Sequence, residues 1–109
     1  MGADAALMGE LARFRGRLVS VLGRVDHVVL FGSHARGETH EWSDVDVMVV
    51  SPAFHGMSQI RRAARARGAW DLPHPVDILC YTPEEFEDLR HQISIVRHAL
   101  EEGAEVGVA

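Results

Sequence analysis

Two hydrophobic runs in the first half of the chain are separated by a polar segment that opens with glycine and serine. The first run, from Val28, stops at Gly32-Ser33, and ten residues lie between Ser33 and Asp44, which with Asp46 opens the second run. Side chains alternate across a strand, so Asp44 and Asp46 point to the same face of it. Carboxylates at the mouth of a hydrophobic strand are unfavourable unless a cation compensates them. A divalent metal with oxygen ligands is the obvious candidate.

Apolar periodicity, together with glycine, proline and capping residues, predicts alternating helices and strands. In chain order we expect a helix over residues 4–22 that Gly23 ends, strands over 25–31 and 44–50, a helix over 58–68, a strand over 76–81, a helix that begins at Thr82-Pro83, and a helix over 94–100 that Gly103 closes. We further expect one domain over residues 1–109, with a single two-layer core. The tail over residues 103–109 should be loosely ordered.

The connections between the three predicted strands define a mixed sheet. A short segment joins the first strand to the second, which makes them antiparallel. A helix joins the second to the third, which is the pattern of a right-handed parallel crossover. The end of the first strand and the starts of the other two therefore share one edge of the sheet. Asp77, in the third strand, meets Gly32-Ser33 and the pair Asp44 and Asp46 there.

Residues 32–38 have the features of an anion site. Backbone N–H groups at a helix start attract anions, and the missing side chain of Gly32 lets a phosphate approach closely. Ser33 adds a hydroxyl and Arg36 a guanidinium, although Arg36 could instead pair structurally with Glu38 or Asp44. Of the seven histidines, His34 is the candidate to touch a substrate, because it adjoins this segment.

Gly32-Ser33 followed by Asp44-x-Asp46, with Asp77 in a later Val-Asp-Ile-Leu strand, resembles the signature of the nucleotidyltransferase superfamily that shares the palm-like fold of DNA polymerase beta. The fuller string GSHARGE…SDVDVMVV is similar to its smallest branch, the minimal nucleotidyltransferases. The resemblance implies an α/β (α+β) fold, in which helices pack on a small mixed β-sheet. It covers most of the chain, from about Val25 to the helix beyond Thr82.

The same resemblance implies a chemistry and the residues that perform it. The enzyme would be magnesium-dependent and use ATP, with two Mg²⁺ ions held by Asp44, Asp46 and Asp77. Asp77 would lie nearest to the incoming hydroxyl and help to deprotonate it. Gly32-Ser33 would grip the outer phosphates, and Arg36 would assist.

The family also implies a partner. Its minimal branch typically pairs, as an antitoxin, with a small helical toxin of the HEPN class and transfers AMP from ATP to a tyrosine hydroxyl of that toxin. Larger relatives carry an extra acceptor-binding domain, for which 109 residues leave no room. A second copy or a separate protein would therefore supply the acceptor surface, which leaves a homo- or hetero-oligomer open. Two alternatives remain: transfer to a small-molecule hydroxyl such as that of an antibiotic, and a non-catalytic module that binds its partner.

Composition argues against several other functions. The net charge of −5 is unfavourable for general nucleic-acid binding, in which phosphate neutralisation dominates affinity. No apolar run approaches the roughly 18 residues of a membrane helix, and the single cysteine, Cys80, fits a reducing compartment. We therefore expect a cytoplasmic protein without membrane contact. The helix over 58–68 should carry one basic patch, either a solvated face or a docking surface for an acidic partner. The patch consists of Arg61, Arg62, Arg65 and Arg67.

Overall fold

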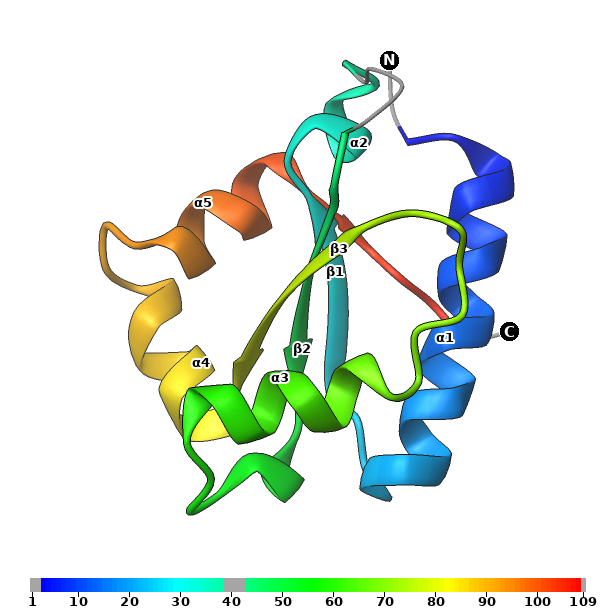
Figure 1. Cartoon of the computed structure of the whole chain (residues 1–109). Helices are drawn as coiled ribbons and strands as arrows, with labels where there is room; N and C mark the ends of the chain where they lie inside the picture. The colour runs from blue at the N-terminus through cyan, green and yellow to red at the C-terminus, as the bar shows by residue number, and fades with distance from the viewer. Residues whose placement is uncertain (1–2, 39–42, 109) are drawn as a thin grey trace.

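The computed structural model describes residues 3–38 and 43–108, and Figure 1 shows a central sheet with helices on both sides of it. The elements are α1 (Ala5–Leu22), β1 (His27–Phe31), α2 (Ser33–Arg36), β2 (Val45–Val50), the short 3-10 helix η1 (Pro52–Phe54), α3 (Gln59–Arg67), β3 (Val76–Tyr81), α4 (Pro83–Arg90), α5 (Ile95–Glu102) and β4 (Ala104–Glu105). Every predicted helix and strand is present, with ends shifted by at most two residues.

The sheet has the strand order β3-β2-β1-β4. β1 is antiparallel to both β2 and β4, and β2 is parallel to β3. These pairings confirm the predicted mixed sheet and the antiparallel and parallel relations of its first three strands. They also confirm that the end of β1 and the starts of β2 and β3 lie at one edge.

Apolar side chains cover both faces of the sheet. Val28 and Val47 belong to a core cluster with residues of α1 and α3, whereas Val29 and Met48 belong to a second cluster with residues of α4 and α5. The expected two-layer core is therefore wrong, because helices form a layer on each face. The physical reason is visible in β1 and β2, whose nearly continuous apolar runs need cover on both sides.

The end of the chain also differs from the expected loosely ordered tail. β4 pairs with β1 through the register partners Leu30 and Ala104. The N–H of Val106 donates to the carbonyl of Val28 at 2.7 Å, and the Val106 side chain is buried in the core beside α1. A strand of two residues leaves no periodicity in the sequence, so the pairing could not be predicted there.

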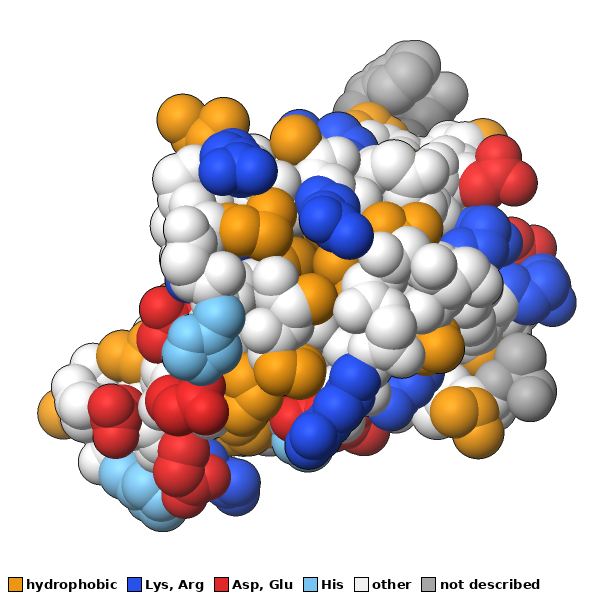
Figure 2. Space-filling view, turned by 90° about the horizontal axis from the view of Figure 1, so that it is seen from below, with side chains coloured by type: hydrophobic (Ala, Val, Ile, Leu, Met, Phe, Trp, Pro, Cys, Tyr) orange, Lys and Arg blue, Asp and Glu red, His pale blue; other side chains and the backbone are white. Residues whose placement is uncertain are grey.

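Three of the four arginines of the expected basic patch, Arg61, Arg65 and Arg67, are exposed on α3. Arg62 is 6% exposed and turns inward. Arg65 Nη2 donates to the carbonyl of Val21 at 3.1 Å, and Arg67 Nη2 donates to that of Val76 at 3.5 Å. At the end of the molecule opposite α2, Figure 2 shows several arginine side chains standing apart with hydrophobic and uncharged groups between them.

No helix within residues 3–38 and 43–108 is both long enough and apolar enough to span a membrane.

Candidate active site

β1 ends in a turn that requires glycine. Gly32 has φ 74° and ψ −157°, a conformation that residues with a side chain rarely adopt. The turn closes on itself, since the N–H of Ala35 donates to the Gly32 carbonyl at 3.0 Å and that of Glu38 donates to the Ser33 carbonyl at 2.9 Å. Gly37, with φ 74°, then ends α2 in the left-handed conformation. The predicted turn and the single helical turn after it are both present.

Gly32 faces Asp46 directly. Phe31, the residue before Gly32, is the register partner of Asp46 across the antiparallel pair. A Cβ atom added at Gly32 would clash with Oδ2 of Asp46. Glycine is therefore required at this position twice, for the backbone angle and for the close approach of the turn to the carboxylate.

Asp46 and Asp77 lie opposite each other on β2 and β3. They are register partners in the parallel pair, and Asp44 directly precedes β2. Burial raises the pKa of the Asp46 carboxyl above its ordinary value, and the charges of Asp77 and Asp44 raise it further, while His34 and Arg36 oppose them. The three predicted carboxylates thus act on one another at one edge of the sheet. Asp46 and Asp77 lie on the face that α4 and α5 cover, because Met48 and Leu79, two residues further along, pack there.

The donor chemistry of this edge suits a hard divalent cation, because Mg²⁺ prefers carboxylate oxygens. Within the described part of the chain, no three acidic, histidine or cysteine side chains are already placed to hold a metal ion together. Asp44 and Asp77 are exposed, so their carboxylates can turn without displacing packed side chains. Mutual repulsion keeps such groups apart when no cation compensates them. The residues therefore fit a metal by chemistry, and their role as ligands stays a prediction.

Two histidines flank the carboxylates. His34 Nε2 lies 3.2 Å from the carbonyl oxygen of Ser43, and the ring centroids of His34 and His74 are 5.8 Å apart. His34 thereby joins α2 to the residue before Asp44. The neighbouring position of His74 was not predicted from sequence. Its only signal there is its place in the proline-framed segment that introduces β3.

Arg36 is held by two carboxylates. Its Nε donates to Oε1 of Glu38 at 2.6 Å, and its Nη1 donates to Oε2 of Glu102 at 2.8 Å. Pairing with Glu38 is one of the structural roles that the sequence left open for Arg36. Glu102 lies 66 residues further along the chain, at the end of α5, and no spacing in the sequence signals it. The positive charge of Arg36 is thus compensated within the protein.

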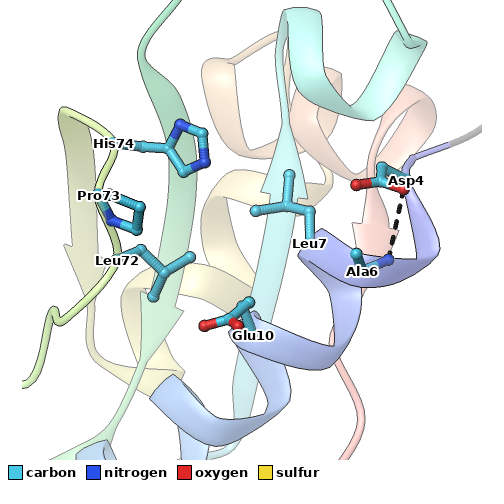
Figure 3. Close-up of a pocket in the computed structure, with 7 residues that line it drawn as sticks. All are labelled: Asp4, Ala6, Leu7, Glu10, Leu72, Pro73 and His74. Carbon is cyan, nitrogen blue, oxygen red and sulfur yellow. Dashed lines mark hydrogen bonds between the residues drawn. The ribbon is translucent and has the colours of Figure 1, made fainter.

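A hollow adjoins the site between the first turns of α1 and the segment before β3 (Figure 3). Asp4 lies on its rim, where Oδ1 accepts from the N–H of Ala6 at 3.4 Å, and the buried Leu7 points into it. His74 is the residue that the hollow shares with the surroundings of the carboxylates, and none of the three predicted carboxylates lines it. The candidate active site is therefore the open edge of the sheet and not this hollow.

These residues lie in a part of the chain that matches a known family of domains. A sequence profile described as a nucleotidyltransferase domain matches residues 11–103, a span that contains every candidate site residue. No curated protein sequence matches the chain significantly.

Several solved structures share the fold. A proposed nucleotidyltransferase from Sulfolobus solfataricus has a TM-score of 0.64 and 17% identity over 92% of this chain and 78% of that one. A toxin–antitoxin solved with AMP-PNP has a TM-score of 0.61 and 20% identity over 94% of this chain and 73% of that one. A mutant of the toxin–antitoxin MntA-HpeT has a TM-score of 0.59 and 18% identity, with the same coverage of 94% and 73%. At such identities the likeness establishes the fold.

Proposed function

Since the chain belongs to the nucleotidyltransferase domain family, we propose that it transfers AMP from ATP to a hydroxyl group of an acceptor. The observation that supports this proposal best is the close approach of Gly32 to Asp46, with Asp77 in register beside it. A glycine turn pressed against clustered carboxylates has no evident structural benefit, because burial and the charges of Asp77 and Asp44 raise the pKa of Asp46.

The acidic residues would hold the metal. Asp44, Asp46 and Asp77 offer carboxylate oxygens to Mg²⁺, and bound Mg²⁺ would supply positive charge that stabilises the attacking and departing oxygens. Asp77 is exposed at the start of the edge strand β3, so it is accessible to an acceptor from solvent. We assign to its carboxylate the role of accepting the proton from the incoming hydroxyl.

The turn would bind the polyphosphate. Gly32 leaves room for a close approach of phosphate oxygens, and Ser33 offers a hydroxyl and a backbone N–H. Arg36 would assist through its charge, and Glu38 and Glu102 hold its guanidinium. In the reaction, the acceptor oxygen forms a bond to the α-phosphorus, the bond to the bridging oxygen breaks, and pyrophosphate leaves. The acceptor proton passes to Asp77.

The acceptor that fits best is a tyrosine hydroxyl on a HEPN toxin for which this chain is the antitoxin. Two of the structures with this fold are described as toxin–antitoxins, one of them with an ATP analogue. This support concerns the class of partner, since those chains are only 20% and 18% identical to this one. Transfer to a small-molecule hydroxyl and inhibition of a toxin by binding alone are the alternatives.

The test uses α-labelled ATP, Mg²⁺ and a candidate HEPN partner, with mass spectrometry of the partner. We expect addition of AMP units to a partner tyrosine by the native chain and none by Asp46→Asn. If the partner stays unmodified while it is tightly bound and inhibited, inhibition by binding alone is the function and the enzymatic proposal is wrong. If the label appears on a small molecule and not on the partner, transfer to a small-molecule hydroxyl is supported.

A further inference from the structure

Glu102, which lies outside the predicted site, contacts two of its residues. Its Oε1 accepts from the backbone N–H of Gly32 at 3.1 Å, and its Oε2 accepts from Arg36 Nη1 at 2.8 Å. Its side chain is 17% exposed. Burial alone would raise the pKa of Glu102, but the hydrogen bonds from Gly32 and Arg36 outweigh burial and hold the pKa below its ordinary value. The carboxylate is therefore ionised at neutral pH; Oε1 is bound by Gly32, and Oε2 by Arg36, with His98 Nε2 3.3 Å from the same oxygen.

The backbone around Glu102 is fixed to the sheet. The N–H of Gly103 donates to the carbonyl of Ala99 at 2.8 Å, which ends α5, and Ala104 pairs at once with Leu30 in β1. Figure 1 shows the end of α5 meeting the sheet close to the start of α2. Glu102 is thus the last residue of α5 and lies two residues from a paired strand, so its backbone is anchored on both sides beside the Gly32 turn.

We propose that Glu102 is a positioning residue for nucleotide binding. By holding the N–H of Gly32 and the guanidinium of Arg36 at once, it fixes the turn and the cation relative to each other, so that both can face one polyphosphate. This inference rests on the proposed function, because it concerns the same site. Glu102 acts through Gly32 and Arg36 and does not touch the reacting atoms.

The same two contacts would also suit the opposite role, that of a built-in anion that competes with phosphate for Arg36. The low exposure of the Glu102 side chain and its hydrogen bond to the backbone of Gly32 favour positioning, because a competitor has to leave its place when the ligand arrives. The two roles predict changes of opposite sign in affinity. A binding measurement therefore separates them.

Isothermal titration of the full chain with AMP-PNP and Mg²⁺ is the test, with Glu102→Ala and Glu102→Gln as variants. Glu102→Ala removes both contacts and should raise Kd about tenfold, as expected for loss of hydrogen bonds to charged groups. Glu102→Gln keeps an oxygen that can accept from Gly32 and loses the ionic bond to Arg36, so it should raise Kd about threefold. In steady-state assays the effect should appear in KM for ATP more than in kcat.

Glu101→Gln is the matched control. Glu101 is the neighbouring residue of α5, is 64% exposed and pairs only at 3.6 Å with Arg97, so this variant changes the net charge equally without touching the turn. Its Kd should equal that of the native chain. Arg36→Ala should add little to Glu102→Ala in the double variant, because Glu102 acts partly through Arg36.

The outcomes are distinct. An unchanged Kd for AMP-PNP in folded Glu102→Ala would overturn the positioning role. Tighter binding by this variant would also overturn it and would show that Glu102 competes with phosphate. If Glu102→Ala fails to fold by circular dichroism, the near-isosteric Glu102→Gln decides by the same criterion. If the native chain binds AMP-PNP and both Glu102 variants bind it with the same affinity, this inference is overturned and the proposed function stands. Absence of binding by the native chain would overturn the proposed function as well.

Discussion

The two ends of the parallel pair β2–β3 differ in how their charged side chains are compensated. At the end where the strands start, Asp46 lies opposite Asp77, and burial together with its acidic neighbours raises its pKa. At the end where they finish, the buried guanidinium of Arg62 donates to the carbonyl of Cys80 at 3.3 Å and, through Nη1, to Glu85 Oε1 at 2.6 Å. A second bond from Nη2 to Glu85 Oε2, at 3.2 Å, makes the pair bidentate.

This difference separates structural charge from functional charge. A buried charge with satisfied hydrogen bonds and an opposite partner is tolerated as part of the fold, as at Arg62. Like charges gathered at one place destabilise the fold unless a ligand compensates them, as at Asp46. The first arrangement links α3 to α4, whereas the second leaves a site that a cation can enter.

The largest expected effect comes from removing the charge at the acidic end. Asp46→Asn should lower transfer of AMP at least about a hundredfold, because the position loses a charged metal ligand. A carboxyl with a raised pKa in the folded state stabilises only where it is protonated, and this contribution is lost as pH rises through that pKa. At neutral pH without divalent ions, the melting temperature of Asp46→Asn should therefore equal or exceed that of the native chain. Near-normal magnesium-dependent activity in this variant would contradict the functional role assigned to the charge of Asp46.

Removing the charge at the other end should have the reverse outcome. Arg62→Ala removes a donor from the Cys80 and Met57 carbonyls and the partner of Glu85, and should lower the free energy of unfolding by about 2–4 kcal/mol. Activity per folded molecule should stay close to that of the native chain. Urea unfolding measures the first quantity, and Arg61→Ala, on the exposed side of the same helix, serves as the control. Equal stability of the two variants would show that Arg62 is not structural.

The pH dependence of stability should sharpen the comparison. The hydrogen bond from Arg62, together with backbone and hydroxyl groups of Thr82, holds the pKa of Glu85 below its ordinary value of 4.5. The stability that ionised Glu85 contributes is therefore present above pH 4.5 and is lost as pH falls through its lowered pKa in the folded state. Glu85→Gln keeps the capping geometry and removes the charge. Its melting temperature should lie below that of the native chain at neutral pH, and the gap should shrink in acid.

The smallest effect concerns Arg61, the exposed neighbour of Arg62. If a protein acceptor docks against α3, Arg61→Glu should slow its modification a few-fold, more at low salt than at high salt, since charges at an interface rim act mainly on association rate. Affinity for AMP-PNP should not change. An equal effect at all salt concentrations would mean that the variant acts on the fold and not on docking.

Local signals in the sequence predicted most of the fold. The helix expected to begin at Thr82-Pro83 does so with a capping box, in which the Thr82 hydroxyl accepts from the Glu85 N–H at 3.2 Å and the Thr82 N–H donates to Glu85 at 2.8 Å. Cys80, in the predicted strand over 76–81, is buried in the core. The sequence did not show that Glu85 also accepts hydrogen bonds from Arg62, 23 residues away, because such a contact depends on how α3 and α4 pack.

The same limit applies at the site. Gly32, Asp46 and Asp77 could be brought together from strand order alone, since register follows from topology and side-chain alternation. Glu102 could not, because its contact with Gly32 spans 70 residues and depends on β4, whose two residues carry no pattern. The roles of all these residues in catalysis stay predictions that the variants above test.

The strand order also bears on which parts of the site move. β2 and β1 are the inner strands, with neighbours on both sides, whereas β3 lies at an edge of the sheet. Amide protons of inner strands exchange with solvent most slowly, because they open only with large parts of the molecule. We expect the amides of β2 around Asp46 to exchange far more slowly than those of β3 around Asp77. The half of the site that holds the nucleotide would then be rigid, and adjustment to different acceptors would occur on the side of Asp77.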